Sequence, residues 1–125
     1  MRSIKTIKAP EPIGPYSQAV SHGNTLYISG QIGIDPKAGS IVGGGIEAQA
    51  TQVMKNLEAI LHHVGLTFEN VLKCTIFLND MSDFAAVNAI YGKHLKEPFP
   101  ARETVSVKGL PAGALVEISA IAGLD

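Results

Sequence analysis

The chain has 125 residues, of which 46% are hydrophobic and 17% are charged, and its formal net charge at pH 7 is -1. This composition is typical of a globular domain and does not indicate a disordered chain. A net charge so close to zero provides no long-range field that would attract nucleic acid or an anionic membrane. The length suits one modest core, so we expect residues 1–125 to form a single domain.

Two features of the sequence bear on its compartment. Cys74 is the only cysteine, which excludes an internal disulfide and favours a reducing environment. Polar and apolar residues alternate at the start of the chain without the apolar core of a signal peptide, and no apolar run approaches the roughly 20 residues of a membrane span. These features favour a cytoplasmic protein with no membrane partner, with the mitochondrial matrix as the alternative compartment.

Alternating apolar and polar residues predict strands along the chain. The predicted strands cover residues 3–7, 25–30, 71–78, 104–107 and 115–122, with a weaker candidate at residues 17–21. Turn-forming residues at 35–39 separate two further short strands.

Two segments have the residue spacing of helices with one apolar face. The first covers residues 47–64, and Gly65 suits its end. The second begins near Ser82 or Asp83. Its apolar stripe consists of Phe84, Val87, Tyr91 and Leu95. The order of strands and helices predicts an α+β fold in which both helices pack on one face of a sheet.

The side of the sheet opposite the helices is predicted to be polar. If apolar positions such as Val105 and Val107 cover the helices, the alternate positions face the other way. These alternate positions are Tyr27, Ser29, Gln31, Arg102, Thr104, Ser106, Glu117 and Ser119. Phe77, Leu115 and Ile121 share that side, and their apolar side chains favour partial burial against a second surface. The face is therefore either exposed to solvent or a polar interface between subunits.

Arg102 and Glu117 both belong to this predicted face, on strands that follow each other in the sequence. We expect the two side chains to approach each other across the sheet. One interpretation is an exposed structural ion pair, worth only ~0–1 kcal/mol. The other is a carboxylate-binding arginine beside a general acid or base, because the planar guanidinium binds a carboxylate at two points and a glutamate can move a proton.

Other motifs favour structural roles. Gly43–Gly45 lacks the Lys-Ser/Thr pair of a phosphate loop. The histidines have no metal-ligand spacing with acids or with the cysteine, so no metal site is expected. Cys74 shares the apolar side of its strand with Leu72 and Ile76 and is predicted to be a core thiol.

Four blocks of sequence form a specific pattern over nearly the whole chain. They are residues 13–19 (Ile-Gly-Pro-Tyr-Ser-Gln-Ala), residues 27–32 (Tyr-Ile-Ser-Gly-Gln-Ile), residues 73–91, which begin Lys-Cys-Thr-Ile-Phe-Leu-Asn-Asp, and residues 99–118, which contain Phe-Pro-Ala-Arg and Val-Glu-Ile. In these blocks the chain resembles the RidA (YjgF-type) family. The resemblance implies a chorismate-mutase-like fold and a homotrimer whose clefts lie between subunits.

The resemblance also implies an activity, the hydrolysis of reactive 2-imino and enamino acids to 2-keto acids and ammonia. The small-molecule substrates would be 2-iminobutanoate and 2-iminopropanoate, released by pyridoxal-phosphate enzymes. No cofactor is implied, because a protonated imine is already electrophilic and the positioning of the substrate and one water provides much of the rate gain.

Carried over to this sequence, the resemblance assigns Arg102 to the substrate carboxylate and Glu117 to the attacking water. The residues that would line or support the cleft are Tyr16, Ser29, Gly30 and Asn88. Thr104 takes a substrate-binding position that is often cysteine in the family and that contributes mainly backbone contacts. Glu103 follows the arginine where a small residue is usual, and there it could either interact with Arg102 or add negative charge near it.

Two alternatives stay open. Some members of the family are described as ribonucleases or translation inhibitors, but a net charge of -1 and the lack of interleaved basic and aromatic residues argue against RNA as a partner. The second alternative is a non-catalytic protein that binds small carboxylates through Arg102.

Overall fold

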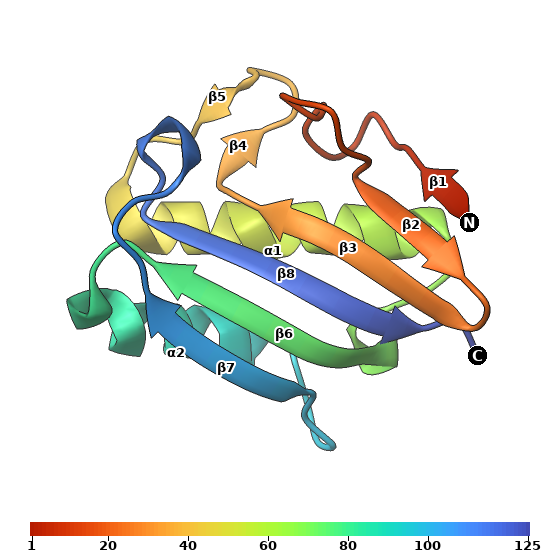
Figure 1. The fold of residues 1–125 in the computed structure, drawn as a ribbon. Helices are drawn as coiled ribbons and strands as arrows, with labels where there is room; N and C mark the ends of the chain where they lie inside the picture. The colour runs from red at the N-terminus through yellow and green to blue at the C-terminus, as the bar shows by residue number, and fades with distance from the viewer.

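The computed structural model describes residues 1–125 and contains a six-stranded sheet, a two-stranded ribbon and two α-helices (Figure 1). The strands are β1 (Arg2–Ile4), β2 (Ala19–His22), β3 (Thr25–Gln31), β4 (Ile34–Asp35), β5 (Ser40–Ile41), β6 (Val71–Leu78), β7 (Ala101–Ser106) and β8 (Val116–Gly123). The helices are α1 (Gly45–His63) and α2 (Phe84–Lys93). The predicted α+β class is confirmed. Neither helix combines the length and apolar character that a membrane crossing requires.

The large sheet has the strand order β1-β2-β3-β8-β6-β7. All neighbouring strands are antiparallel except β6 and β7, which are parallel because α2 crosses over between them. This crossover places β7 at the edge of the sheet (Figure 1). The separate ribbon of β4 and β5 flanks the turn predicted at residues 35–39.

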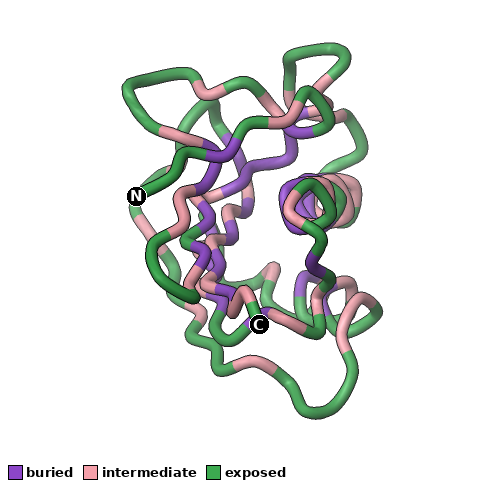
Figure 2. Tube along the Cα trace, turned by 90° about the vertical axis from the view of Figure 1, so that its right-hand side faces the viewer, coloured by how far each residue is buried: buried purple, intermediate pink, exposed green.

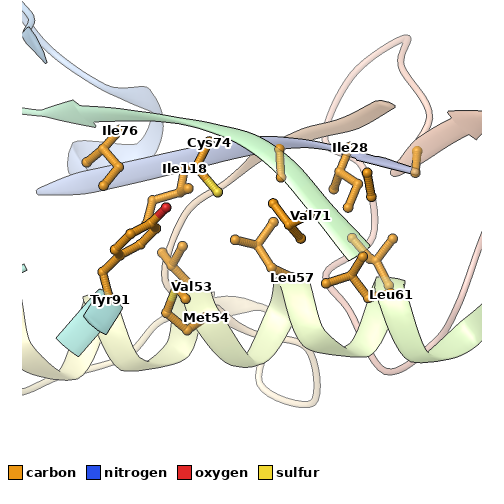
Figure 3. Close-up of a cluster of buried hydrophobic side chains, with 14 of the residues drawn as sticks. Ile28, Val53, Met54, Leu57, Leu61, Val71, Cys74, Ile76, Tyr91 and Ile118 are labelled. Atoms are coloured by element: carbon orange, nitrogen blue, oxygen red, sulfur yellow. The ribbon is translucent and has the colours of Figure 1, made fainter. Parts of the chain in front are cut away.

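α1 forms because its apolar residues recur on one side of the helix. Its large buried apolar side chains are Val53, Met54, Leu57, Ile60 and Leu61. None of these is more than 1% exposed, and Figure 3 shows this side of the helix against the strands. The helix begins at Gly44 and Gly45, with φ of 109° and 76°, a left-handed conformation that only glycine adopts without strain. The predicted helix at residues 47–64 is thus confirmed.

Both helices cover the same face of the sheet, as predicted. Figure 2 shows the sheet from its edge, with the helices on one side and the buried segments between the two layers. We call the side that the helices cover the inner face and the opposite side the outer face. Along β8 the residues alternate between buried and half-buried, so Val116 and Ile118 lie on the inner face and Glu117 on the outer face.

The predicted orientation of β7 is wrong. Arg102 is paired with Cys74 and Thr104 with Ile76, so these β7 residues point to the inner face, as does Ser106. Val105 points outward instead and is 43% exposed. The partner strand decides the orientation, because residues paired in adjacent strands project to the same side of a sheet.

Two further residues lie on the face opposite to the predicted one. Gln31 is 5% exposed and is paired with Ile118 on the inner face, because an irregularity in β3 shifts the register after Ile28. Leu72 is 57% exposed, since a similar shift in β6 places Val71 in the core. A single extra residue in a strand therefore reverses the side to which the following side chains project.

Candidate active site

Glu117 lies in a cleft of about 320 Å³ at the end of the sheet where β8 begins. The irregular end of β3 forms one wall, with Ser29 and Gly30. The loop before β2 contributes Tyr16, and the loop before β8 contributes Pro111. Four of the predicted site residues, Tyr16, Ser29, Gly30 and Glu117, are thus brought together.

The Glu117 carboxyl group is half-buried, and desolvation raises its pKa above the ordinary value of a glutamate. No lysine or arginine lines this cleft. Its other acid is Glu11, which is paired with Lys5 (Nζ–Oε1 distance 3.2 Å). A carboxyl group with a raised pKa transfers protons more readily near neutral pH than an ordinary glutamate does.

The wall of the cleft is fixed by the buried amide of Gln18. Its Oε1 accepts from the Thr6 backbone N–H at 2.7 Å, and its Nε2 donates to the carbonyls of Thr6 at 3.0 Å and Pro10 at 2.9 Å. The Ser29 hydroxyl donates to the Ser17 carbonyl at 2.6 Å. These bonds tie the N-terminal segment to β3, so the cleft has a wall of fixed shape.

Arg102 belongs to a second group of residues, between the edge strand β7 and helix α2. Its Nη1 donates to Asn88 Oδ1 at 2.5 Å. Its Cζ lies 5.2 Å from the ring centre of Tyr91 and 5.6 Å from that of Phe84, distances at which a guanidinium is attracted to an aromatic face. No acidic side chain forms an ion pair with Arg102.

Thr104 lies next to this group on the inner face. Its hydroxyl is buried without a hydrogen-bond partner, as is the hydroxyl of Tyr91. The neighbouring Cys74 thiol is buried, and desolvation raises its pKa, so it is a neutral core group as predicted.

The two groups do not meet within one chain. Arg102 projects from the inner face and Glu117 from the outer face, and β6 lies between their strands. The predicted approach of Arg102 to Glu117 is therefore wrong, and so is the alternative of a structural ion pair between them. Glu103 does not interact with Arg102 either, because it projects to the outer face and is paired with Lys73 (Nζ–Oε1 distance 3.1 Å).

Of the neighbours of Arg102 on α2, Asn88 is predicted from the sequence but the two aromatic residues are missed. Phe84 and Tyr91 were assigned only to an apolar helical stripe, and Tyr91 is indeed buried. The signal that could have found them is their spacing from Asn88, because residues 84, 88 and 91 lie on one side of a helix. The pattern also gave no indication that Glu11 lines the Glu117 cleft.

The family model described as Endoribonuclease L-PSP matches residues 6–124, and the chain belongs to this family, the RidA/YjgF proteins. The human 2-iminobutanoate/2-iminopropanoate deaminase is 50% identical over 121 residues, which cover 97% of this chain and 88% of the human protein.

Two solved structures show the same fold. RidA from the Antarctic bacterium Psychrobacter sp. PAMC 21119 is 46% identical with a TM-score of 0.95, and the match covers 98% of this chain and 99% of that one. A Thermotoga maritima protein described as a putative endoribonuclease is 44% identical with a TM-score of 0.96, over 100% of this chain and 98% of that one.

Proposed function

We propose that this protein hydrolyses reactive 2-imino acids, such as 2-iminobutanoate and 2-iminopropanoate, to 2-keto acids and ammonia, in the cytoplasm and without a cofactor. The observation that carries the proposal is the exposed Arg102 guanidinium, which Asn88 and two aromatic rings hold and no acid neutralises. Such a planar set of donors is suited to a substrate carboxylate. The name of the human relative supports imino acids as the substrate class.

The proposed site requires two copies of the chain, because Arg102 and Glu117 lie on opposite faces of one sheet. We expect the outer face to be covered in a homotrimer, so that Arg102 of one copy reaches the Glu117 cleft of the next. Exposed apolar side chains support a covered face, since Tyr27 is 46% and Val105 43% exposed on it. Stable interfaces of this kind bury about 1,200–2,000 Å².

In the completed cleft, Arg102 binds the substrate carboxylate and Glu117 lies beside the protonated imine. The Glu117 carboxylate accepts a proton from water while the water oxygen bonds to the imine carbon, and the C=N electron pair moves to nitrogen. The resulting carbinolamine takes the proton from Glu117 onto its nitrogen. Its hydroxyl then gives a proton to the Glu117 carboxylate as the C–N bond breaks and forms ammonia and the 2-keto acid. The proton on Glu117 passes to the ammonia, which leaves as ammonium and restores the carboxylate. Proton transfer of this type contributes typically ~10²–10⁴-fold.

Tyr16, Ser29 and Gly30 would line this cleft, while Asn88 would orient Arg102. Thr104 would contribute through its backbone, because its hydroxyl is buried beneath the strand. An RNA substrate is less well supported, since the cleft of one chain contains two carboxyl groups and no cation, and Arg102 is the single cation that a neighbouring copy would add.

The experiment that tests the proposal mixes two variants, Arg102→Ala and Glu117→Gln, by joint refolding. Each variant alone should fail to hydrolyse freshly generated 2-iminobutanoate. Randomly mixed trimers should regain about a quarter of the wild-type activity, because this fraction of clefts combines an intact arginine with an intact glutamate from different copies.

Each other outcome contradicts part of the proposal. A mixed sample without activity would contradict the shared cleft, and a monomer in sedimentation would contradict the trimer. Binding of 2-oxobutanoate without hydrolysis by the wild type would indicate a carboxylate-binding protein. Cleavage of RNA by highly purified protein, with imines left unchanged, would favour the ribonuclease alternative.

A further inference from the structure

The Arg102 guanidinium is held by one side of a single helix. Phe84, Asn88 and Tyr91 are four and three residues apart on α2, so their side chains project toward β7 together. Asn88 accepts a hydrogen bond from Nη1, and the two rings lie 5.6 Å and 5.2 Å from Cζ. The guanidinium therefore has one hydrogen-bond acceptor and two aromatic neighbours within the same chain.

Tyr91 contributes to this group through its ring. The residue is 6% exposed, and its hydroxyl is buried without a hydrogen-bond partner. Figure 3 shows the ring on the inner face of the sheet, with its hydroxyl directed toward the strands near Cys74. Burial raises the pKa of the phenol above the ordinary value of a tyrosine, so the side chain stays neutral at pH 7 and its ring offers an electron-rich face to the cation.

We propose that Tyr91 and Phe84 are positioning residues that hold Arg102 ready for a carboxylate. An arginine on an edge strand has several rotatable bonds, and its freedom would otherwise be lost when the ligand binds. Two aromatic contacts restrict that freedom beforehand and leave the remaining N–H groups for the ligand. This inference rests on the proposed role of Arg102 in binding the substrate carboxylate.

Variants that remove the hydroxyl of Tyr91 and variants that remove its ring are expected to behave differently. Tyr91→Phe keeps the ring and removes only a buried hydroxyl that faces Cys74 and makes no hydrogen bond to Arg102, so it should bind 2-oxobutanoate as the wild type does. Tyr91→Leu and Phe84→Leu each remove one aromatic contact and should weaken binding about 3- to 30-fold. Phe68→Leu is the matched control, because Phe68 is an aromatic residue that packs against His94 and is not one of the two rings beside Arg102.

Two readouts separate positioning from a merely structural role. In the Arg102→Ala background, Tyr91→Leu should cause no further loss of binding, since a positioning residue acts only through the arginine. In nuclear magnetic resonance spectra, the Arg102 Nε–Hε signal should move toward the position of the exposed Arg2 signal in Tyr91→Leu and in Phe84→Leu. That shift needs neither ligand nor turnover.

Several outcomes would overturn the inference. Unchanged binding and an unchanged Arg102 signal in Tyr91→Leu would do so, as would an equal loss of binding with and without Arg102. If Tyr91→Leu does not fold, Phe84→Leu decides the matter by the same two readouts, because Phe84 is 38% exposed and less important to the core. Failure of imine hydrolysis with Arg102-dependent binding retained would instead overturn only the proposed function.

Discussion

Gly30 and Glu117 are in direct contact between the irregular end of β3 and the start of β8. A Cβ atom at residue 30 would lie 2.7 Å from Cδ of Glu117, closer than real Cβ atoms approach a neighbour. The nearest atoms all belong to the flexible end of the glutamate side chain. The absence of a side chain at Gly30 therefore determines where the Glu117 carboxyl group lies.

Gly30→Ala should displace the carboxyl group while the fold is kept. We expect kcat for 2-iminobutanoate to fall about 10- to 100-fold, because small errors in the position of a reacting group are costly. Gly43→Ala is the matched control, since a Cβ there meets no atom within 4 Å. Steady-state kinetics and circular dichroism check the prediction, and equal kinetics for both variants would contradict it.

Glu117→Gln should stabilise the protein at neutral pH. The folded-state pKa of Glu117 is raised above its unfolded value, so its contribution to stability is complete below the unfolded pKa and is lost as the pH rises through the folded pKa. The neutral glutamine avoids this loss. The difference in Tm between variant and wild type should thus be small near pH 4 and grow toward pH 7, as calorimetry can measure. A difference that is largest in acid would refute this assignment of the shift.

Arg102→Lys should keep the charge but lose the planar arrangement of donors. We expect a tenfold to hundredfold fall in kcat/KM, since hydrogen bonds to charged groups contribute roughly 1.5–3 kcal/mol. Arg2→Lys is the control, because Arg2 is the only other arginine and lies far along the sheet in β1. Near-normal kcat/KM in Arg102→Lys would show that the charge alone suffices.

Cys74 should resist thiol reagents in the folded protein. Its thiol is buried and its pKa is raised by desolvation, so little reactive thiolate is present at neutral pH. A colorimetric disulfide reagent should label Cys74 about tenfold or more slowly in the folded protein than in denaturant. Rapid labelling without denaturant would indicate that the α2–β6 contact opens readily.

The sequence was sufficient for the elements whose apolar pattern is strong. Residues 71–78 were predicted as a strand and are β6, and the helical spacing of residues 47–64 identified α1. In both cases one side is almost fully buried, so the periodicity of apolar residues reports the structure directly.

The sequence was insufficient where a neighbouring strand decides the outcome. Val105 suggested the buried side of β7, but the pairing of Thr104 with Ile76 places Val105 outside. An edge strand pairs with only one neighbour, and its two sides differ little in the number of apolar residues. Its orientation therefore depends on contacts with other segments, which the sequence of the strand alone does not reveal. The orientation of β7 also decides which predicted site residues meet. The structure brings Tyr16, Ser29, Gly30 and Glu117 together in one cleft, but Arg102 projects to the other face of the sheet.

The crossover of α2 between two parallel strands has a genetic consequence. Arg102 and every side chain that holds it are encoded within residues 71–106, whereas the cleft around Glu117 is built from residues 10–34 and 111–117. Recombination between related genes at the borders of residues 71–106 would transfer Arg102 and its supporting side chains as one segment. The buried residues of this segment share one core cluster with α1 and β8, so a chimaera would need parents whose core side chains match.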